Sequence, residues 1–124
     1  MNCHRPSVRE IEKRLEEAKI ALKNKSGFYA NFAKAVGELF ELDIENHEEI
    51  WDLIRGLLDE IQPQDYAGGR PPQKSYEKPV ENRELFAFCW NSTRMRKRMY
   101  LKFVVKDGRY YYISLHKSRY EESV

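Results

Sequence analysis

The sequence predicts an α+β fold, in which N-terminal helices pack on a twisted antiparallel β-meander. Apolar residues recur at helical spacing through residues 1–61. Residues 62–83 are rich in Pro, Gly and Gln, which is typical of a loop, with room for one short strand. Residues 84–118 contain alternating apolar runs that predict antiparallel strands. A chain of 124 residues is long enough for one core, so we expect a single domain over residues 1–124.

The first helix is predicted to begin at a capping box. Ser7 and Glu10 have the spacing at which each side chain bonds the backbone amide of the other residue. An apolar stripe follows and ends before Asn24-Lys25-Ser26-Gly27; its members are Ile11, Leu15, Ala18 and Leu22.

Two further helices are expected before residue 62. The second covers residues 28–40, with Phe32, Val36 and Leu39 facing inward and Gly37 as a weak point. The third is capped by Asn46, with Glu49 at the box position. Its apolar side is expected to pack on the sheet and consists of Ile50, Trp51, Ile54, Leu57 and Ile61.

The loop after the helices contains Gly68-Gly69, which could let the backbone approach a phosphate. The spacing of a P-loop is absent, so a plain connector is the simpler interpretation.

A strand over residues 84–91 precedes a β-hairpin within residues 94–119. If Asp107-Gly108 were a two-residue turn, Lys106 would face Arg109, and both faces would mix polar and apolar side chains. If Lys106-Asp107-Gly108 is a three-residue loop with Gly108 as a G1 bulge, Val105 faces Arg109 and the two kinds of side chain separate. We therefore predict the bulged register, because a slip of one residue would send the apolar set to the wrong side.

This register gives the hairpin one apolar and one polar face. The apolar face comprises Met99, Leu101, Phe103, Val105, Tyr111, Ile113 and Leu115. The polar face comprises Arg96, Arg98, Tyr100, Lys102, Tyr110, Tyr112, Ser114 and His116.

The polar face has the side chains needed for RNA cleavage without a metal. Arg98 and Lys102, with the basic residues at 94, 96 and 97, can hold phosphate oxygens, and interleaved tyrosines can stack on unpaired bases. Histidine ordinarily titrates near neutrality, so His116 can act as general acid or base. A hydroxyl such as that of Tyr100 or Ser114 could orient the phosphate.

Each of these features also has a plainer interpretation. A basic run is often a solvated turn or a deterrent on an edge strand. A histidine near a strand end is often an ordinary surface residue, and Tyr110-Tyr111-Tyr112 could be cross-strand packing. Their convergence on one face carries more weight than any one of them.

Charge and composition narrow the classes of protein. The net charge is +2, but residues 1–60 hold 9 basic against 13 acidic residues and residues 61–124 hold 13 against 7. Cys3 and Cys89 indicate no disulfide framework, and the three histidines are too dispersed for a ligand cluster, so we expect no metal and no cofactor. No segment has the length and apolarity of a membrane span, and the N-terminus lacks a signal-peptide core, so a cytoplasmic protein is expected.

Five segments between residues 43 and 117 occur in an order that resembles a known family. They are Ile54-Arg-Gly-Leu57 at a helix end, Asp65-Tyr66 opening a Gly/Pro loop, Phe88 in a strand, Tyr100-Leu-Lys102, and Ile113-Ser-Leu-His116. Their order and spacing resemble the MqsR-type toxins of bacterial toxin–antitoxin pairs, which belong to the RelE/ParE superfamily of small α+β proteins. A RelE-like arrangement of helices and sheet is therefore expected.

The resemblance implies an mRNA interferase, an endoribonuclease held inactive by a cognate antitoxin protein, and it leaves open whether the ribosome is needed. Matching positions imply catalytic roles for His116, Tyr100 and Lys102. Together with the polar face, it leads us to expect RNA or phosphate contacts from Arg98, Arg70, Arg96, Tyr66, Ser114 and Tyr112. The Tyr100–His116 spacing is one residue longer than in those toxins, and a bulge at Gly108 would absorb that residue.

The chain also departs from the family pattern. Those toxins have a lysine soon after the Asp-aromatic pair, whereas this chain offers only Arg70 a few residues later, and it has Phe88-Cys89-Trp90 where they have a Trp-Gln pair. Two other classes therefore remain open. One is a non-catalytic RelE/ParE-like toxin that acts on a protein target such as a topoisomerase, and the other is a nucleic-acid-binding or partner-binding module. An exposed strand edge at residues 84–91 could pair with a second copy or with an antitoxin strand.

Overall fold

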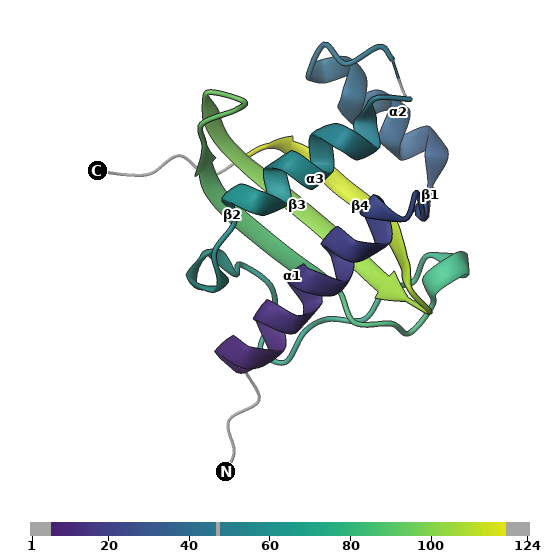
Figure 1. Ribbon diagram of the computed structural model, residues 1–124. Coiled ribbons are helices and arrows are strands. Elements are labelled where there is room, and N and C mark those ends of the chain that lie inside the picture. Colours follow the sequence, from purple (N-terminus) through teal and green to yellow (C-terminus); the bar gives the residue numbers. More distant parts are fainter. Residues whose placement is uncertain (1–5, 47, 119–124) are drawn as a thin grey trace.

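A computed structural model describes residues 6–46 and 48–118 and confirms the α+β class (Figure 1). In chain order, the helices are α1 (Val8–Lys23), α2 (Phe32–Glu41) and α3 (Ile50–Glu60). The strands are β1 (Gly27–Tyr29), β2 (Phe86–Ser92), β3 (Lys97–Lys106) and β4 (Arg109–Lys117), and two short 3-10 turns lie at Pro63–Asp65 and Lys78–Val80. The strand order in the sheet is β1-β4-β3-β2.

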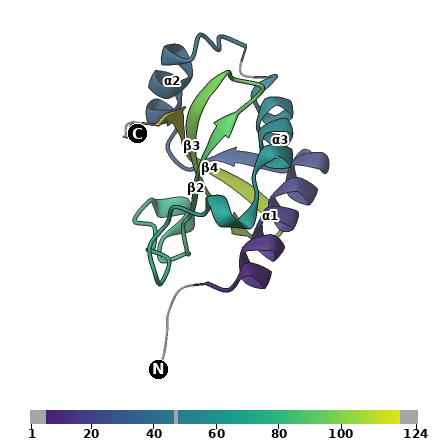
Figure 2. The same ribbon diagram turned by 90° about the vertical axis from the view of Figure 1, so that its left-hand side faces the viewer.

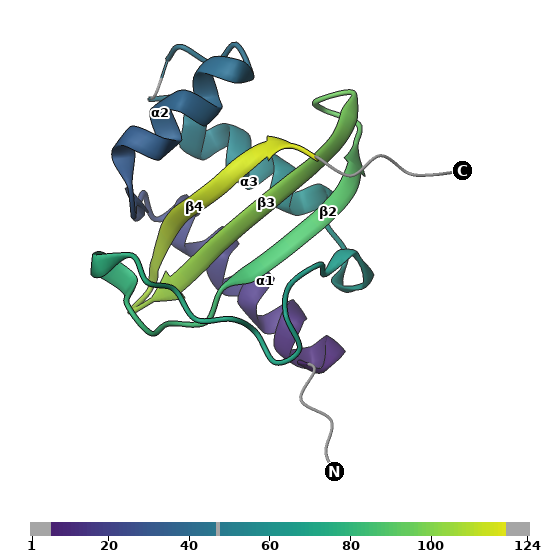
Figure 3. The same cartoon turned by 180° about the vertical axis from the view of Figure 1, so that it is seen from behind.

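The two faces of the sheet are covered differently. Helices α1 and α3 lie side by side across one face (Figures 1 and 2). The opposite face, called the outer face below, is crossed by the segment between α3 and β2 only at the end nearest the β3–β4 turn (Figure 3). Helix α2 lies beside β4 at the margin of the outer face. Away from that turn, none of the described helices or loops crosses the outer face (Figure 3).

The predicted capping box of the first helix is confirmed. The Ser7 hydroxyl accepts from the Glu10 amide at 3.1 Å, and the Glu10 carboxylate accepts from the Ser7 amide at 3.0 Å. The predicted stripe is buried in the main core with α3, β2 and β3. For the third helix, the predicted cap was wrong: α3 begins at Ile50, and the Asn46 side chain instead bonds the Glu48 amide and the Glu49 carboxylate.

The prediction of one helix over residues 28–40 was wrong in two respects. Residues 27–29 form β1, which pairs in parallel with Tyr110–Tyr112 of β4. In α2, Phe32 and Val36 are exposed, whereas Ala35, Glu38 and Leu39 face inward. Gly27 has to be small, because the ring of Trp51 lies where a Cβ atom at that position would be.

The predicted three-residue hairpin loop was also wrong. Asp107 and Gly108 have φ values of 54° and 75°, which fit a two-residue type I′ turn, and Lys106 pairs with Arg109. The register then shifts by one residue, because Phe103 pairs with Tyr112 but Lys102 pairs with Ser114. Ile113 is therefore the extra residue of a β-bulge in β4.

This register corrects the two predicted faces. Tyr110 and Tyr112 lie in the core under the helices, at 0% and 1% exposure, and not on the polar face. Tyr111 and Ile113 lie on the outer face, in a small second cluster with Val80 and Val104. The antiparallel meander of β2, β3 and β4 is confirmed.

Candidate nucleic-acid interface on the outer face

Tyr100 and His116 lie opposite each other on the outer face, toward the end of the sheet away from the β3–β4 turn. They are direct partners in the β3–β4 register, and their rings stack with centroids 4.9 Å apart and planes 19° apart. The bulge at Ile113 produces this pairing, since an unbroken ladder from the Asp107-Gly108 turn would place Leu115 opposite Tyr100. The prediction that both side chains share one face is confirmed, although the bulge lies at Ile113 and not at Gly108.

The hydrogen bond of His116 defines which nitrogen can take up a proton. Its Nδ1 lies 2.7 Å from the carbonyl oxygen of Lys117. A carbonyl oxygen only accepts, so in the neutral ring Nδ1 carries the hydrogen and donates it. The Nε2 lone pair is then the one that can accept a proton from a ligand.

Lys102 lies beside this pair and is half-buried. Its Nζ is 5.9 Å from the centroid of the Tyr100 ring. Burial lowers the pKa of Lys102, the charge of nearby Lys34 lowers it further, and Glu38 opposes the shift. Lys102 is thus a cation that gives up its proton more readily than an ordinary lysine.

Lys34 of helix α2 lies near this site because a buried carboxylate attaches α2 to β4. Glu38 accepts a hydrogen bond from the Tyr112 hydroxyl at 2.7 Å and another from the Leu115 amide at 3.0 Å. Lys34 lies one helical turn before Glu38, on the margin of the outer face. The contact between α2 and β4 therefore adds a second positive charge near Lys102.

A hollow of about 280 Å³ opens beside Tyr100 and Lys102. Its other lining residues come from the segment before β2 and from β2 itself: Ala67, Gly68, Gly69, Gln73, Leu85 and Ala87. A hollow of this size is just below the range of drug-sized pockets and suits one small planar group.

Tyr66 supports the loop that lines this hollow. It is 7% exposed, its ring packs against Phe86 and Phe88, and its hydroxyl donates to the Gly69 carbonyl at 2.6 Å. A Cβ atom on Gly68 would lie 2.6 Å from the same hydroxyl oxygen. The predicted RNA contact by Tyr66 does not fit this position, since the side chain holds the loop from beneath.

The remaining predicted contacts differ in position. Tyr112 is in the core, where burial and Glu38 raise the pKa of its hydroxyl, and it presents no surface to a ligand. Ser114 is on the outer face but only 3% exposed. Arg98 is on the outer face next to Tyr100 and donates to Asn91 at 3.4 Å, whereas Arg96 lies in the exposed β2–β3 turn. Arg70 is exposed on the loop, close enough to lower the pKa of Tyr66 against the larger effect of burial.

The β2–β3 turn is held in place by Glu60 at the end of α3. The Glu60 carboxylate accepts from Trp90 Nε1 at 2.9 Å, from the Ser92 hydroxyl at 2.7 Å and from the Arg94 amide at 2.9 Å. Burial acts to raise the pKa of Glu60, but these donors lower it overall. Glu60 therefore holds Arg94, the first residue of the predicted basic run, in place.

Sequence reasoning missed Lys34 and Gln73. Lys34 has no signal, because nothing local relates α2 to β3. Gln73 lies in the loop that the sequence predicts to be a plain connector. Polar and apolar residues do not alternate regularly there, so no pattern singles out Gln73. Among residues 6–46 and 48–118, no cluster of His, Cys, Asp and Glu side chains could hold a metal ion. The described helices include none that is long and apolar enough to cross a membrane.

Comparisons of the chain with protein-family models, with curated proteins and with solved structures found no match.

Proposed function

We propose that the protein is an endoribonuclease that cleaves RNA on the outer face by general acid–base catalysis. The observation that carries the proposal is the grouping of three side chains: His116 stacked on Tyr100, with Lys102 beside the same ring. Arg98 and Lys34 add positive charge around them. Cationic and aromatic side chains on one open surface suit the backbone and bases of a single strand.

His116 is the proposed base. Its Nε2 takes the proton of the 2′-hydroxyl, and the 2′-oxygen then forms a bond to phosphorus. The bond from phosphorus to the 5′-oxygen breaks, and Lys102 gives its proton to that oxygen. The products are a 2′,3′-cyclic phosphate and a 5′-hydroxyl end. Because its pKa is lowered, Lys102 is a better acid near neutral pH than an ordinary lysine.

Tyr100 and Arg98 have supporting roles in this scheme. Arg98 would stabilise the charge that gathers on the phosphoryl oxygens in the transition state. Tyr100 would orient the phosphate, and a base flanking the cleaved bond would enter the hollow beside its ring.

The resemblance to MqsR-type toxins supports the same activity. It adds two expectations: messenger RNA in the cytoplasm is the substrate, and a cognate antitoxin protein inhibits the enzyme.

The test is cleavage of a labelled RNA of mixed sequence in the presence of EDTA, followed by analysis of the new ends. Wild type should cut and leave cyclic phosphates. His116→Ala should slow cleavage by about 100-fold or more, because general acid–base catalysis contributes about 10²–10⁴-fold. Lys117→Ala is the matched control. It removes a cation from the next position of β4, which pairs with Met99 and faces away from the outer face, so the rate should be nearly unchanged.

Two results would count against the proposal. Equal cleavage by wild type and His116→Ala would remove His116 from the chemistry. RNA binding without cleavage, on free RNA and on translating ribosomes alike, would favour a binding module.

A further inference from the structure

Helix α2 presents an apolar stripe to solvent. Phe32, Val36 and Phe40 follow one another at intervals of four residues and are 56%, 37% and 76% exposed. Beside them, a Cβ atom added to Gly37 would meet no atom within 4 Å. Large apolar side chains gathered on one side of a surface helix are unusual in a protein that acts alone and mark an interaction site.

Helix α2 cannot rotate to bury this stripe against the described part of the sheet. The other side of α2 already buries Ala35, Glu38 and Leu39. Glu38 fixes the rotation of the helix about its axis, because it accepts hydrogen bonds from Tyr112 and Leu115 of β4. A rotation that buried Phe40 would take that carboxylate away from both donors.

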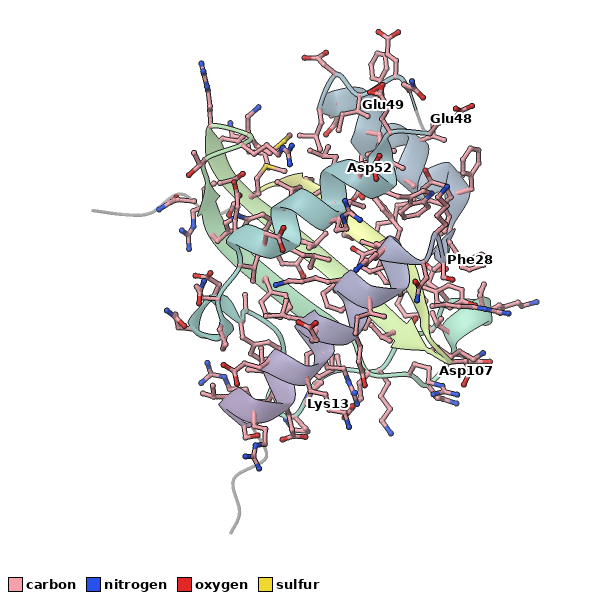
Figure 4. The ribbon with its side chains drawn as sticks, viewed as in Figure 1. Lys13, Phe28, Glu48, Glu49, Asp52 and Asp107 are labelled. Carbon is pink, nitrogen blue, oxygen red and sulfur yellow. The ribbon has the colours of Figure 1, made fainter. Side chains whose placement is uncertain are left out.

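The surface that follows the stripe is acidic. Between Lys34 and Arg55 the chain has seven Asp and Glu residues and no Lys or Arg. Six of these carboxylates are exposed: Glu41, Asp43, Glu45, Glu48, Glu49 and Asp52. Glu48, Glu49 and Asp52 lie together where α3 begins (Figure 4). Asp43, Glu45, Glu49 and Asp52 contribute to the lining of an open hollow of about 520 Å³, in which Arg94 is the basic member.

We propose that α2 is the docking site of a partner protein that supplies a basic amphipathic helix. Its apolar side chains would pack along Phe32, Val36 and Phe40, and its Lys and Arg residues would meet the carboxylates beyond Phe40. A second copy with its α2 stripe parallel to the first would bring two acidic groups together, whereas a basic helix would meet the carboxylates with charges of opposite sign. The docking site is separate from His116 and Tyr100, so it does not depend on the proposed ribonuclease activity.

The test uses two synthetic helical peptides with the same leucine spacing, one flanked by lysines and the other by glutamates. Binding to the full chain is followed by fluorescence anisotropy at low and at high salt. The lysine peptide should bind, its affinity should fall with salt, and the glutamate peptide should not bind. Phe40→Ser should weaken binding of the lysine peptide by about tenfold or more.

Tyr76→Ser is the matched control, because Tyr76 is an aromatic residue that is 86% exposed on the segment before β2. It should leave peptide binding unchanged. Equal binding of both peptides, or equal loss in Phe40→Ser and Tyr76→Ser, would overturn the proposal. Sedimentation that shows a dimer of the chain, broken by Phe40→Ser, would overturn it in favour of a second copy.

Discussion

Two buried tyrosines of β4 differ in whether the hydroxyl group makes a hydrogen bond. Tyr110 and Tyr112 both point into the core and are 0% and 1% exposed. The Tyr112 hydroxyl donates to Glu38 at 2.7 Å, whereas the Tyr110 hydroxyl has no hydrogen-bond partner among the described residues. Substitution of either residue by Phe removes one oxygen and keeps the ring, so the pair isolates the value of the hydrogen bond.

Tyr112→Phe should destabilise the protein by about 1.5–3 kcal/mol, the usual contribution of a hydrogen bond to a charged group, because it leaves Glu38 with the Leu115 amide as its remaining donor. Tyr110→Phe should be neutral or stabilise by about 1 kcal/mol, since it removes a buried polar atom that makes no bond. The two variants should therefore differ by about 1.5–4 kcal/mol.

Urea denaturation followed by circular dichroism measures this difference directly. The midpoints should separate while the slopes stay equal, because neither variant changes the surface exposed on unfolding. In a thermal scan each kcal/mol should shift the midpoint by about 3–5 °C for a chain of this size. Equal midpoints for the two variants, or a larger loss in Tyr110→Phe, would refute the assignment of Glu38 as the anchor of α2 on β4.

Three further predictions follow from other parts of the structure. Because burial lowers the pKa of Lys102, affinity for a non-cleavable 2′-O-methyl RNA should begin to fall with rising pH before the ordinary lysine pKa is reached. Lys102→Arg should retain its affinity to higher pH, and parallel titration curves for the two proteins would contradict this. Gly27→Ala should destabilise by about 1–3 kcal/mol, because its Cβ would lie 2.6 Å from the Trp51 ring. Gly37→Ala, the matched change at an open helix position, should stabilise by about 0.5–1 kcal/mol in the same urea assay, and similar effects of the two alanines would be the contrary result. Since the pKa of Glu60 is lowered by folding, its stabilisation is present above the ordinary glutamate pKa and is lost as the pH falls through the folded value, so wild type should lose more stability on acidification than Glu60→Gln.

The parts of the fold that depend on local signals could be predicted from the sequence. Ser7 and Glu10 define the start of α1 through contacts three residues apart, and the alternation of Phe86, Phe88 and Trp90 identifies the buried side of β2. The meander itself could be predicted because its strands are consecutive and joined by short turns.

The orientation of α2 could not be predicted, because its apolar pattern indicates the wrong side. Phe32, Val36 and Phe40 form the more hydrophobic stripe, yet the buried side has Glu38 at its centre. Burial of that carboxylate is favourable only with donors from β4, about 75 residues later, and no local pattern reports such a contact.

The prediction of the hairpin register failed for a related reason. Tyr110, Tyr111 and Tyr112 are consecutive and identical, so within this segment a slip of one residue only exchanges one tyrosine for another. The bulge at Ile113 places Tyr100 and His116 on one face, which is what the predicted loop at Gly108 was meant to provide. The shared face of the two residues was therefore predicted correctly and its cause was not.

The loop that lines the hollow also lies along part of the outer edge of β2. Tyr66 and Ala67 pair with Phe88 and Ala87 of β2, and the Leu85 amide donates to the Gln73 carbonyl. Two of the backbone groups that a foreign strand would need there, the Leu85 amide and the Ala87 carbonyl, are thus already bonded within the chain. A foreign strand would have to displace this loop before it could pair with residues 84–88, so strand addition and growth into filaments are disfavoured along that stretch.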